Sequence, residues 1–214
     1  KKVIYRNFPN EKPLLSSGRK ITGWEKLSKD LPDLPNIAKG KIWTAPIPKN
    51  LIKFYTLYDR GKRLPRARSK GFKPVLGPKD KNRSNTALHY PDGAPLKNWS
   101  NIEDVEIVIR PFCLWTMNIL PLKHVDEEHK IAHTALEGSY PLTTERHGRF
   151  GTESVWVENV LNALDQPGEW VLNTQDGMIY LWPEFSEPGN EIIAPRLTEL
   201  VCVRGDDKAG KTVQ

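Results

Sequence analysis

The pattern of apolar positions is most regular between residues 148 and 203, where it predicts a helix followed by a hairpin. Apolar side chains recur there at spacings of three and four residues, which is typical of one face of a helix. They belong to Val157, Val160, Leu161 and Leu164. Ser154 or Thr152 is suited to cap the start, and Pro167-Gly168 would end the helix. The pattern therefore predicts one short α-helix.

Alternation with a period of two predicts β-strands in most of the remaining chain. Residues 170–173 and 178–182 alternate on either side of the polar turn 174–177, which predicts a hairpin. A second hairpin is predicted from residue 54 to 64, with Gly61 free to take a positive φ at its turn. Another strand is predicted at residues 105–110, with Val105, Ile107 and Ile109 facing inward. Further short strands are predicted at residues 3–8, 12–16, 21–27, 43–47, 87–90, 115–122 and 125–131.

Composition agrees with a β-rich, turn-rich protein. Of the 214 residues, 38% are hydrophobic, 18 are proline and 15 are glycine. Seven tryptophans are too many to leave in water, which argues against disorder. We expect one elaborated domain, built from antiparallel hairpins that close into a small barrel or sandwich.

Charge is distributed unevenly along the chain. The net charge is +6, but residues 1–100 hold 23 basic and 7 acidic residues, whereas residues 101–214 hold 9 and 19. The two parts therefore carry +16 and −10. This asymmetry indicates either a polyanionic partner for the basic half or two halves that face and neutralise each other in the fold.

The two cysteines, Cys113 and Cys202, each stand in an apolar run, so we expect buried thiols, although a disulfide stays open. No stretch approaches the roughly 18 apolar residues of a membrane span, and no signal peptide is visible. The chain opens directly on a strand-like run, which suggests that it was cut from something longer.

Several segments together resemble a known group of proteins. One is the helix followed by 164–170, 179–183 and 193–201; the others are 58–68 and the pair 3–9 and 18–24. The chain resembles large secreted bacterial carbohydrate-active proteins with a right-handed parallel β-helix. Within that group it looks most like the glycoside hydrolases that include α-L-fucosidases and xylanases.

The resemblance implies a mainly β chain with a small antiparallel β-barrel or sandwich inserted between right-handed parallel β-helix turns. Residues 1–23 would form β-helix-like turns, residues 24–147 the inserted β-domain, and residues 148–214 the short helix, the hairpin and the return to the β-helix. A secreted or periplasmic, polysaccharide-degrading protein is implied, with the remaining β-helix of the same protein as a partner. In the resembled hydrolases the catalytic carboxylates lie on later turns, which would follow Gln214, so we assign no catalytic residue here.

Candidate chemistry in the chain itself is weak. Glycoside hydrolysis needs two facing carboxyl groups, but the candidates are expected in turns or on solvent faces: Asp92, Asp104, Glu106, Asp126, Glu127 and Glu128. His129 and His133 have the spacing of zinc ligands on a helix, yet no third ligand is evident and the flanking pattern is that of strands. Gly205–Thr212 resembles a phosphate loop only loosely and reads as a solvated terminal loop. We therefore expect no metal and no cofactor.

Aromatic residues interleaved with basic ones are the best remaining signal of function. Stacking and hydrogen-bonding groups of these types would form a platform for a sugar; the candidates are Arg66, Arg68, Tyr90, Asn98 and Trp99. The competing and favoured interpretation is that the aromatic residues fill the core of a small β-domain.

Three hypotheses follow from the sequence. The first is a β-domain of a β-helix glycoside hydrolase that shapes or abuts the glycan cleft, with a polysaccharide, acidic or neutral, as substrate. The second is a stand-alone glycan-binding module without catalysis. The third, ranked last, is nucleic-acid binding by the basic half, because no recognised nucleic-acid motif is present.

Overall fold

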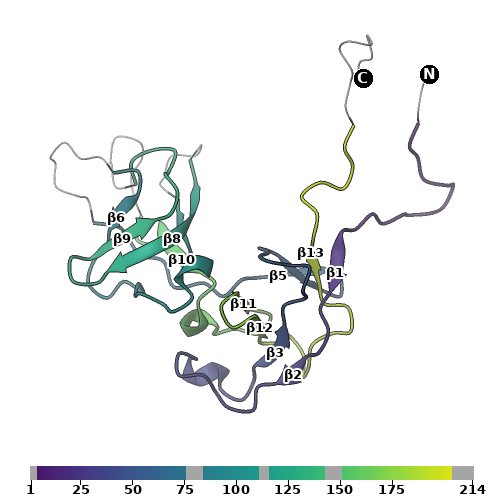
Figure 1. Cartoon of the computed structure of the whole chain (residues 1–214), viewed down its shortest axis with the longest axis horizontal. Helices are drawn as coiled ribbons and strands as arrows, with labels where there is room; N and C mark the ends of the chain where they lie inside the picture. The colour runs from purple at the N-terminus through teal and green to yellow at the C-terminus, as the bar shows by residue number, and fades with distance from the viewer. Residues whose placement is uncertain (1–3, 76–83, 111–115, 143–150, 204–214) are drawn as a thin grey trace, which may run out of the picture.

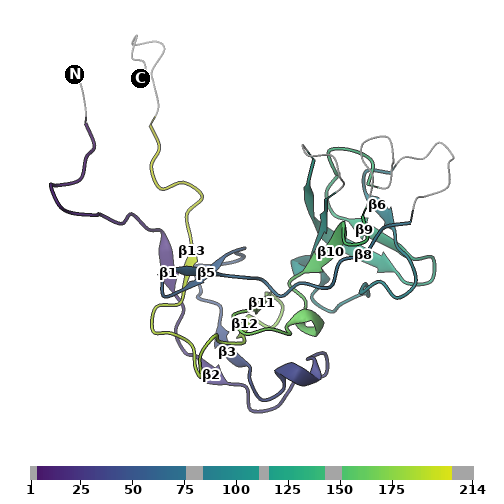
Figure 2. The same ribbon diagram turned by 180° about the vertical axis from the view of Figure 1, so that it is seen from behind.

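The computed structural model of the chain describes residues 4–75, 84–110, 116–142 and 151–203. Within them the protein is mainly β, with three antiparallel sheets (Figure 1). Figure 2 shows from behind that the five-stranded sheet forms a lobe of its own, beside the two four-stranded sheets. The helical elements of these residues are 3-10 turns of three residues: η1 (Asn36–Ala38), η2 (Ile102–Asp104) and η4 (Leu161–Ala163).

The first sheet has the order β1-β13-β4-β5. Its strands are β1 (Gly18–Lys20), β13 (Ile193–Pro195), β4 (Leu57–Asp59) and β5 (Lys62–Leu64). Arg60 and Gly61 join β4 to β5 with φ angles of 49° and 75°. Two successive positive φ angles match the twist of a hairpin, so the hairpin predicted at residues 54–64 is confirmed.

The second sheet, of order β11-β12-β3-β2, lies between two apolar clusters. Its strands are β11 (Trp170–Asn173), β12 (Met178–Leu181), β3 (Trp43–Pro46) and β2 (Glu25–Lys26). Trp170 is fully buried on one face and stacks on Phe54 with ring centroids 5.5 Å apart. Val171 and Tyr180 face the other cluster. The predicted hairpin 170–182 is confirmed, and burial on both faces explains its nearly continuous apolar runs.

The third sheet forms the five-stranded lobe, with the order β10-β7-β8-β9-β6. Its strands are β10 (Val155–Glu158), β7 (Glu106–Ile109), β8 (Asn118–Asp126), β9 (Ile131–Thr134) and β6 (Ala87–His89). Ile107, Ile109, Val155 and Val157 are buried in the lobe's core. As predicted, alternate residues of the strand near 105–110 face inward.

This sheet does not close into a barrel through its named strands, because β6 and β10 end the strand order without pairing to each other. The segment 72–75 lies between these two edges. The Phe72 N–H donates to the Val155 carbonyl at 2.7 Å, and the Val75 N–H donates to the His89 carbonyl at 2.9 Å. The predicted barrel or sandwich is thus replaced by an open sheet whose edges are joined by an irregular segment.

The predicted α-helix over residues 157–164 is wrong. Val155–Glu158 is strand β10, with buried and half-buried residues alternating, as β-branched residues favour. Asn159 then takes a φ of 69°, and Leu161–Ala163 forms the 3-10 turn η4. The helical spacing arose because it combined inward residues of a strand with those of the following turn, Val157 facing the core of the lobe and Leu164 a different core.

The two ends of the chain do not show parallel β-helix turns within the described residues. Residues 4–17 contain no strand there, contrary to the strands predicted at 3–8 and 12–16. β1 and β13 pair antiparallel, with Gly18 opposite Pro195. Cys202 is exposed, contrary to the prediction of a buried thiol, whereas Cys113 lies outside the described residues. None of the helices among the described residues is long and apolar enough to cross a membrane.

Candidate functional site

The predicted residues Arg66 and Arg68 lie on a segment that passes from the second sheet to the five-stranded lobe. Arg66 forms an isolated bridge with Trp170 of β11, and Arg68 forms one with Glu158 of β10. Ala67 between them is fully buried. Both guanidinium groups lie against side chains of β10, Glu158 for Arg66 and Trp156 for Arg68. They therefore share one side of the segment, as their spacing predicted.

Arg66 is a buried ion-pairing residue. Its Nη1 donates to Glu106 Oε2 and lies 3.7 Å from Glu158 Oε2. The side chains of Arg66 and Glu106 are each only 8% exposed. A buried guanidinium needs such partners, because an unpaired charge in the interior is strongly destabilising. Arg66 thus links the crossing segment to the lobe.

Two carboxylates meet at this arginine from neighbouring strands. Glu106 on β7 and Glu158 on β10 are directly opposite each other in the antiparallel register. Like charges at such positions repel, and Arg66 between them offsets the repulsion. Glu106 and Asp104 are 6% and 1% exposed, so the prediction that these acids are solvated is wrong for both.

Arg68 and Arg110 converge on one indole. The Cζ atoms of Arg68 and Arg110 lie 5.1 Å and 5.7 Å from the ring centroid of Trp156. Trp156 Nε1 donates to Glu158 Oε1 at 2.9 Å, which fixes the ring orientation. Both arginines are exposed and Trp156 is half-buried. Guanidinium groups over an aromatic face are attracted by its electron density.

Lys53 and Tyr55 continue this arrangement beyond Arg66. The Arg66 Cζ lies 5.7 Å from the Tyr55 ring, and the Lys53 Nζ lies 5.8 Å from it. Lys53 Nζ also donates to the Glu103 carbonyl at 2.6 Å. We call the whole set the junction strip, and it comprises Lys53, Tyr55, Arg66, Arg68, Glu106, Arg110, Trp156 and Glu158.

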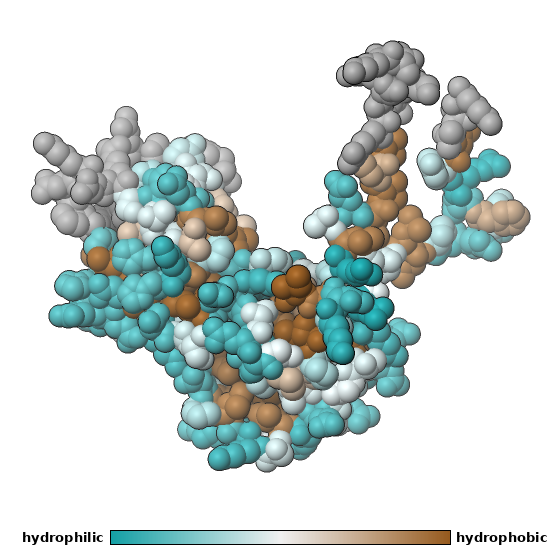
Figure 3. Space-filling view, viewed as in Figure 1, coloured by the Kyte–Doolittle hydropathy of each residue, from teal (hydrophilic) through white to brown (hydrophobic). Residues whose placement is uncertain are grey.

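The junction strip contains outward-facing residues of β10, which lies on the side of its lobe that faces the other two sheets. Figure 3 shows a hollow between this lobe and the part of the molecule that carries β1 and β13. Apolar surface is visible on the side of the lobe that faces the hollow. The strip therefore belongs to the boundary between the two parts of the molecule.

The other predicted residues lie elsewhere, in or beside the core of the five-stranded lobe. Trp99 and Tyr90 are 6% and 4% exposed. Trp99 Nε1 donates to Asn162 Oδ1 at 3.1 Å, and the Tyr90 hydroxyl donates to the Asp126 carbonyl at 3.3 Å. Burial raises the pKa of Tyr90, and the charges of Glu127 and Asp126 raise it further. The rings of Trp99 and Tyr90 contribute to the hydrophobic core.

Asn98 is exposed but also serves the lobe's own structure. Its backbone N–H donates to Glu127 Oε1 at 2.9 Å, and its side-chain Oδ1 accepts from the Val125 N–H at 3.4 Å. These bonds tie the loop before Trp99 to the end of β8. The five predicted residues therefore form two separate groups, and only Arg66 and Arg68 lie at the boundary.

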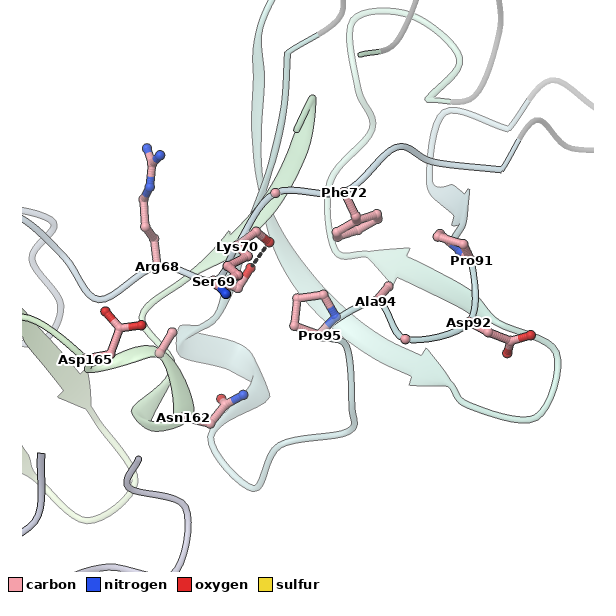
Figure 4. Close-up of a pocket in the computed structure, with 13 residues that line it drawn as sticks. Arg68, Ser69, Lys70, Phe72, Pro91, Asp92, Ala94, Pro95, Asn162 and Asp165 are labelled. Atoms are coloured by element: carbon pink, nitrogen blue, oxygen red, sulfur yellow. Dashed lines mark hydrogen bonds between the residues drawn. The ribbon is translucent and has the colours of Figure 1, made fainter. Parts of the chain in front are cut away.

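A cavity of about 480 Å³ lies where the crossing segment meets the lobe (Figure 4). It is lined by residues 68–72, by the loop 91–95, and by Asn162, Ala163 and Asp165. In Figure 4 the Arg68 side chain extends away from the loop that carries Pro91 and Pro95. Residues 68–72 of the segment thus border the cavity, while the Arg68 guanidinium lies over Trp156 in the junction strip.

The histidines of the described residues do not assemble a metal site. His129 Nδ1 lies 2.9 Å from Asp126 Oδ2, and hydrogen bonds from the His129 backbone and ring lower the pKa of Asp126. His133 instead stacks on His124, with ring centroids 6.1 Å apart. Within the described ranges, no group of three His, Cys, Asp or Glu residues is arranged to hold a metal ion.

Sequence reasoning missed Trp156, Arg110 and Glu158 as members of the site. The signal was present in the alternation of Val155, Trp156, Val157 and Glu158, which as a strand places Trp156 and Glu158 on one face. The predicted helix obscured it. Arg110, at the end of β7, carries no local pattern that marks it.

Comparisons with known proteins give one clear likeness. The sequence matches no protein-family model and no curated protein. The fold is similar to that of a solved structure described as a glycoside hydrolase, with a TM-score of 0.65 and 22% sequence identity. The similarity covers 93% of this chain and 34% of the other chain, so the chain spans about a third of that protein's length. The protein thus has the fold of one part of a glycoside hydrolase.

Proposed function

We propose that this chain is part of a secreted, polysaccharide-degrading glycoside hydrolase with a parallel β-helix. In this proposal the five-stranded lobe shapes or abuts the glycan cleft and does not supply the catalytic acid and base. The observation that carries the proposal is the fold shared over 93% of the chain with a glycoside hydrolase that is about three times as long. Further turns of that longer protein would hold the catalytic carboxylates.

The two ends of the described chain, residues 4–17 and 196–203, which we call the terminal arms, support a larger assembly. They leave the neighbouring strands β1 and β13 and extend on the same side of the molecule (Figures 1 and 2). Their large apolar side chains are more than half exposed, including Ile4, Tyr5, Phe8, Leu14, Leu15, Leu197, Leu200, Val201 and Val203. Exposed apolar surface of this extent is typical of an interaction site. In our proposal these arms pack against the β-helix of the same protein.

The state of the carboxylates supports a non-catalytic role. Glu106 and Glu158, the facing pair, both lie on one Arg66 nitrogen. Asp104 accepts the Thr174 N–H at 2.7 Å and lies 3.7 Å from Lys53 Nζ. A general acid must deliver a proton to a leaving group, whereas these acids are held as acceptors in ion pairs and hydrogen bonds.

Two measurements test the proposal together. The first is the intact mass of the protein from its source, with peptide sequencing past Gln214; we expect a mass several-fold above 24.4 kDa. The second is release of reducing ends from polysaccharides by that longer protein, with Glu158→Gln beside the wild type. We expect kcat/KM to change less than about two-fold, because general acid–base residues contribute about 10²-fold or more. A loss of that size would identify Glu158 as catalytic and overturn the non-catalytic role.

A second candidate is a stand-alone glycan-binding module. The position of the exposed Arg68 and Arg110 over the half-buried Trp156 favours it, since binding needs no acid pair. A source protein of about 24 kDa that is retarded by polysaccharide in affinity electrophoresis, without releasing reducing ends, would select this function.

A further inference from the structure

Five lysines and arginines of the described residues form ion pairs, whereas Arg68 and Arg110 do not. Ion pairs link Lys53 to Asp104, Lys62 to Glu184, Arg66 to Glu106, Lys97 to Asp33 and Lys130 to Asp92. Within the described part of the chain, neither Arg68 nor Arg110 has a carboxylate oxygen within the 4.0 Å of an ion pair. Both are nonetheless gathered at one tryptophan, 5.1 Å and 5.7 Å from its ring centroid.

Two like charges held at one indole need compensation. The ring attracts each guanidinium, but the two cations, 5.1 Å and 5.7 Å from the same ring centroid, also repel each other. Glu158 does not resolve this, because its Oε1 accepts from Trp156 Nε1 and its Oε2 lies by Arg66. Arg68 also interacts with Glu169, whose pKa it lowers. An external anion beside the two guanidinium groups would supply further compensation.

The surface beside the arginines is apolar. Trp156 lies opposite Val108 on β7, and Val108 lies opposite Ile119 on β8, so these side chains share the outer face of the sheet, where Val108 itself is buried. Ile119 and Met117 are 50% and 56% exposed. A sugar ring offers such a surface its C–H groups, while its charged substituent reaches the arginines.

We propose that Arg68, Arg110 and Trp156 form a binding site for an acidic polysaccharide, with the two guanidinium groups holding a carboxylate or sulfate group of one sugar. Planar guanidinium groups bind such oxyanions through paired hydrogen bonds. This site rests on the proposed function and makes it more specific, since it names the class of glycan that the lobe would bind.

The surroundings favour a glycan over a nucleic acid. A phosphate backbone is bound by rows of lysines and arginines, whereas the junction strip contains Glu106 and Glu158 between its basic residues. The charge of Arg66 is already compensated by these two acids. Within the described residues, this one pair of guanidinium groups without an ion pair, beside a partly apolar face, suits a single charged sugar of a chain.

Affinity electrophoresis of the chain tests the site without requiring catalysis. The gels contain polygalacturonate for carboxylates, a sulfated galactan for sulfates, a neutral xylan, or single-stranded DNA. The variants are Arg68→Gln, Arg110→Gln and Arg68→Lys. Arg63→Gln is the matched control. Arg63 is an exposed arginine on β5, so this substitution removes the same charge outside the junction strip.

We expect an acidic polysaccharide to retard the chain, and the glycan that does so identifies the anion. Loss of one charge-assisted hydrogen bond weakens binding about ten-fold, so Arg68→Gln and Arg110→Gln should each lose about that factor. Arg68→Lys should be intermediate, and Arg63→Gln should change affinity less than two-fold. Thermal unfolding confirms that each variant is folded.

Other outcomes overturn the site. Equal losses for Arg63→Gln and Arg68→Gln would show only general charge attraction. Preferential retardation by DNA would replace the glycan with a nucleic acid. If the longer protein hydrolyses polysaccharide while Arg68→Gln and Arg110→Gln bind acidic glycans like the wild type, the site fails and the proposed function stands. If the longer protein neither binds nor hydrolyses any glycan, both fail.

Discussion

At the scale of single residues, a few buried polar groups join the parts of this fold. Asn159 is 1% exposed and follows β10 with a φ of 69°. Its Nδ2 donates to the carbonyls of Asp104 at 3.0 Å and Leu172 at 2.7 Å. Its Oδ1 accepts from the Leu172 N–H at 2.7 Å. One side chain thus satisfies backbone groups of the lobe and of β11 at once.

Asn159→Ala should therefore be strongly destabilising. Each buried backbone group left without a partner costs about 1–3 kcal/mol, so we expect a loss of about 3 kcal/mol or more in the free energy of unfolding, measured with urea. Asn159→Gly should lose about 1 kcal/mol less, because glycine tolerates the positive φ. Asn190→Ala, at an exposed asparagine, is the control. A loss below about 1 kcal/mol for Asn159→Ala would contradict this role.

Glu169 makes stability depend on pH. It is 4% exposed and accepts the backbone N–H groups of Asp165 and Gln166. Burial raises its pKa, and the charge of Asp165 raises it further, against the backbone hydrogen bonds and Arg68, which lower it. The folded protein therefore keeps this proton at pH values where the unfolded chain has lost it. Its stabilising contribution is present below the ordinary pKa of about 4.3 and decreases as pH rises through the raised value.

Glu169→Gln removes this titration. We expect the free energy of unfolding of the variant, relative to wild type, to increase as pH rises from 4 to 7 in urea titrations. Glu191→Gln, at an exposed glutamate, provides a matched charge change elsewhere. A difference between Glu169→Gln and wild type that stays constant with pH would show that burial does not govern this carboxyl group.

At the scale of elements, the crossing segment joins sheets that do not pair with each other. It bridges Trp170 on one side and Glu158 and Val155 on the other. Gly71 lets it pass close to the chain before β10, because an added Cβ would lie 2.7 Å from the Glu153 Cα. Backbone at that distance cannot move aside as a flexible side chain does.

Gly71→Ala should consequently displace the segment. Overpacking of this kind costs about 1–3 kcal/mol, and we expect that loss in the free energy of unfolding together with faster amide exchange at Phe72 and Val155. Lys73→Ala, an exposed residue of the same segment, should change stability by less than about 0.5 kcal/mol. Equal stability for Gly71→Ala and Lys73→Ala would mean that the close approach is absent.

The elements that sequence predicted well are the local ones. Both hairpins follow from alternation and from turn residues within a dozen positions, such as Gly61. The helix failed because Val157 and Leu164 belong to different cores, so their spacing combined a strand with a turn. Local patterns cannot reveal which distant element covers a residue.

The same limit applies to the candidate site. The spacing of Arg66 and Arg68 predicted a shared side, which the structure confirms. Their partners stand about 40 to 90 positions further along the chain, on β7 and β10, and only the folded sheet brings them together. Trp99 and Tyr90, chosen for residue type, are instead buried in the lobe's core.

At the scale of the whole molecule, charge is partly neutralised between the two halves of the sequence. Lys53, Lys62 and Arg66 of the basic half pair with Asp104, Glu184 and Glu106 of the acidic half. Pairing between the halves therefore accounts for these cations, whereas the proposed polyanion would bind Arg68 and Arg110.

The N-terminal arm contributes little to the stability of the three sheets. Between residues 4 and 15 every side chain is exposed, Leu14 to 88% and Tyr5 to 85%. Burial of apolar surface is the main favourable term in folding, so side chains that stay in water contribute little. Deletion of residues 1–15 leaves β1 and its pairing with β13 intact.

We therefore expect this deletion to lower the thermal midpoint by less than about 2 °C, since 1 kcal/mol corresponds to about 2–4 °C at this size. It should also reduce binding of a hydrophobic dye to the folded chain, because exposed apolar residues are removed. In the proposed longer protein the same deletion should lower the thermal midpoint substantially, because these residues would pack against the β-helix. A large loss of stability in the 214-residue chain itself would place the arm's contacts within this chain and remove its support for a larger assembly.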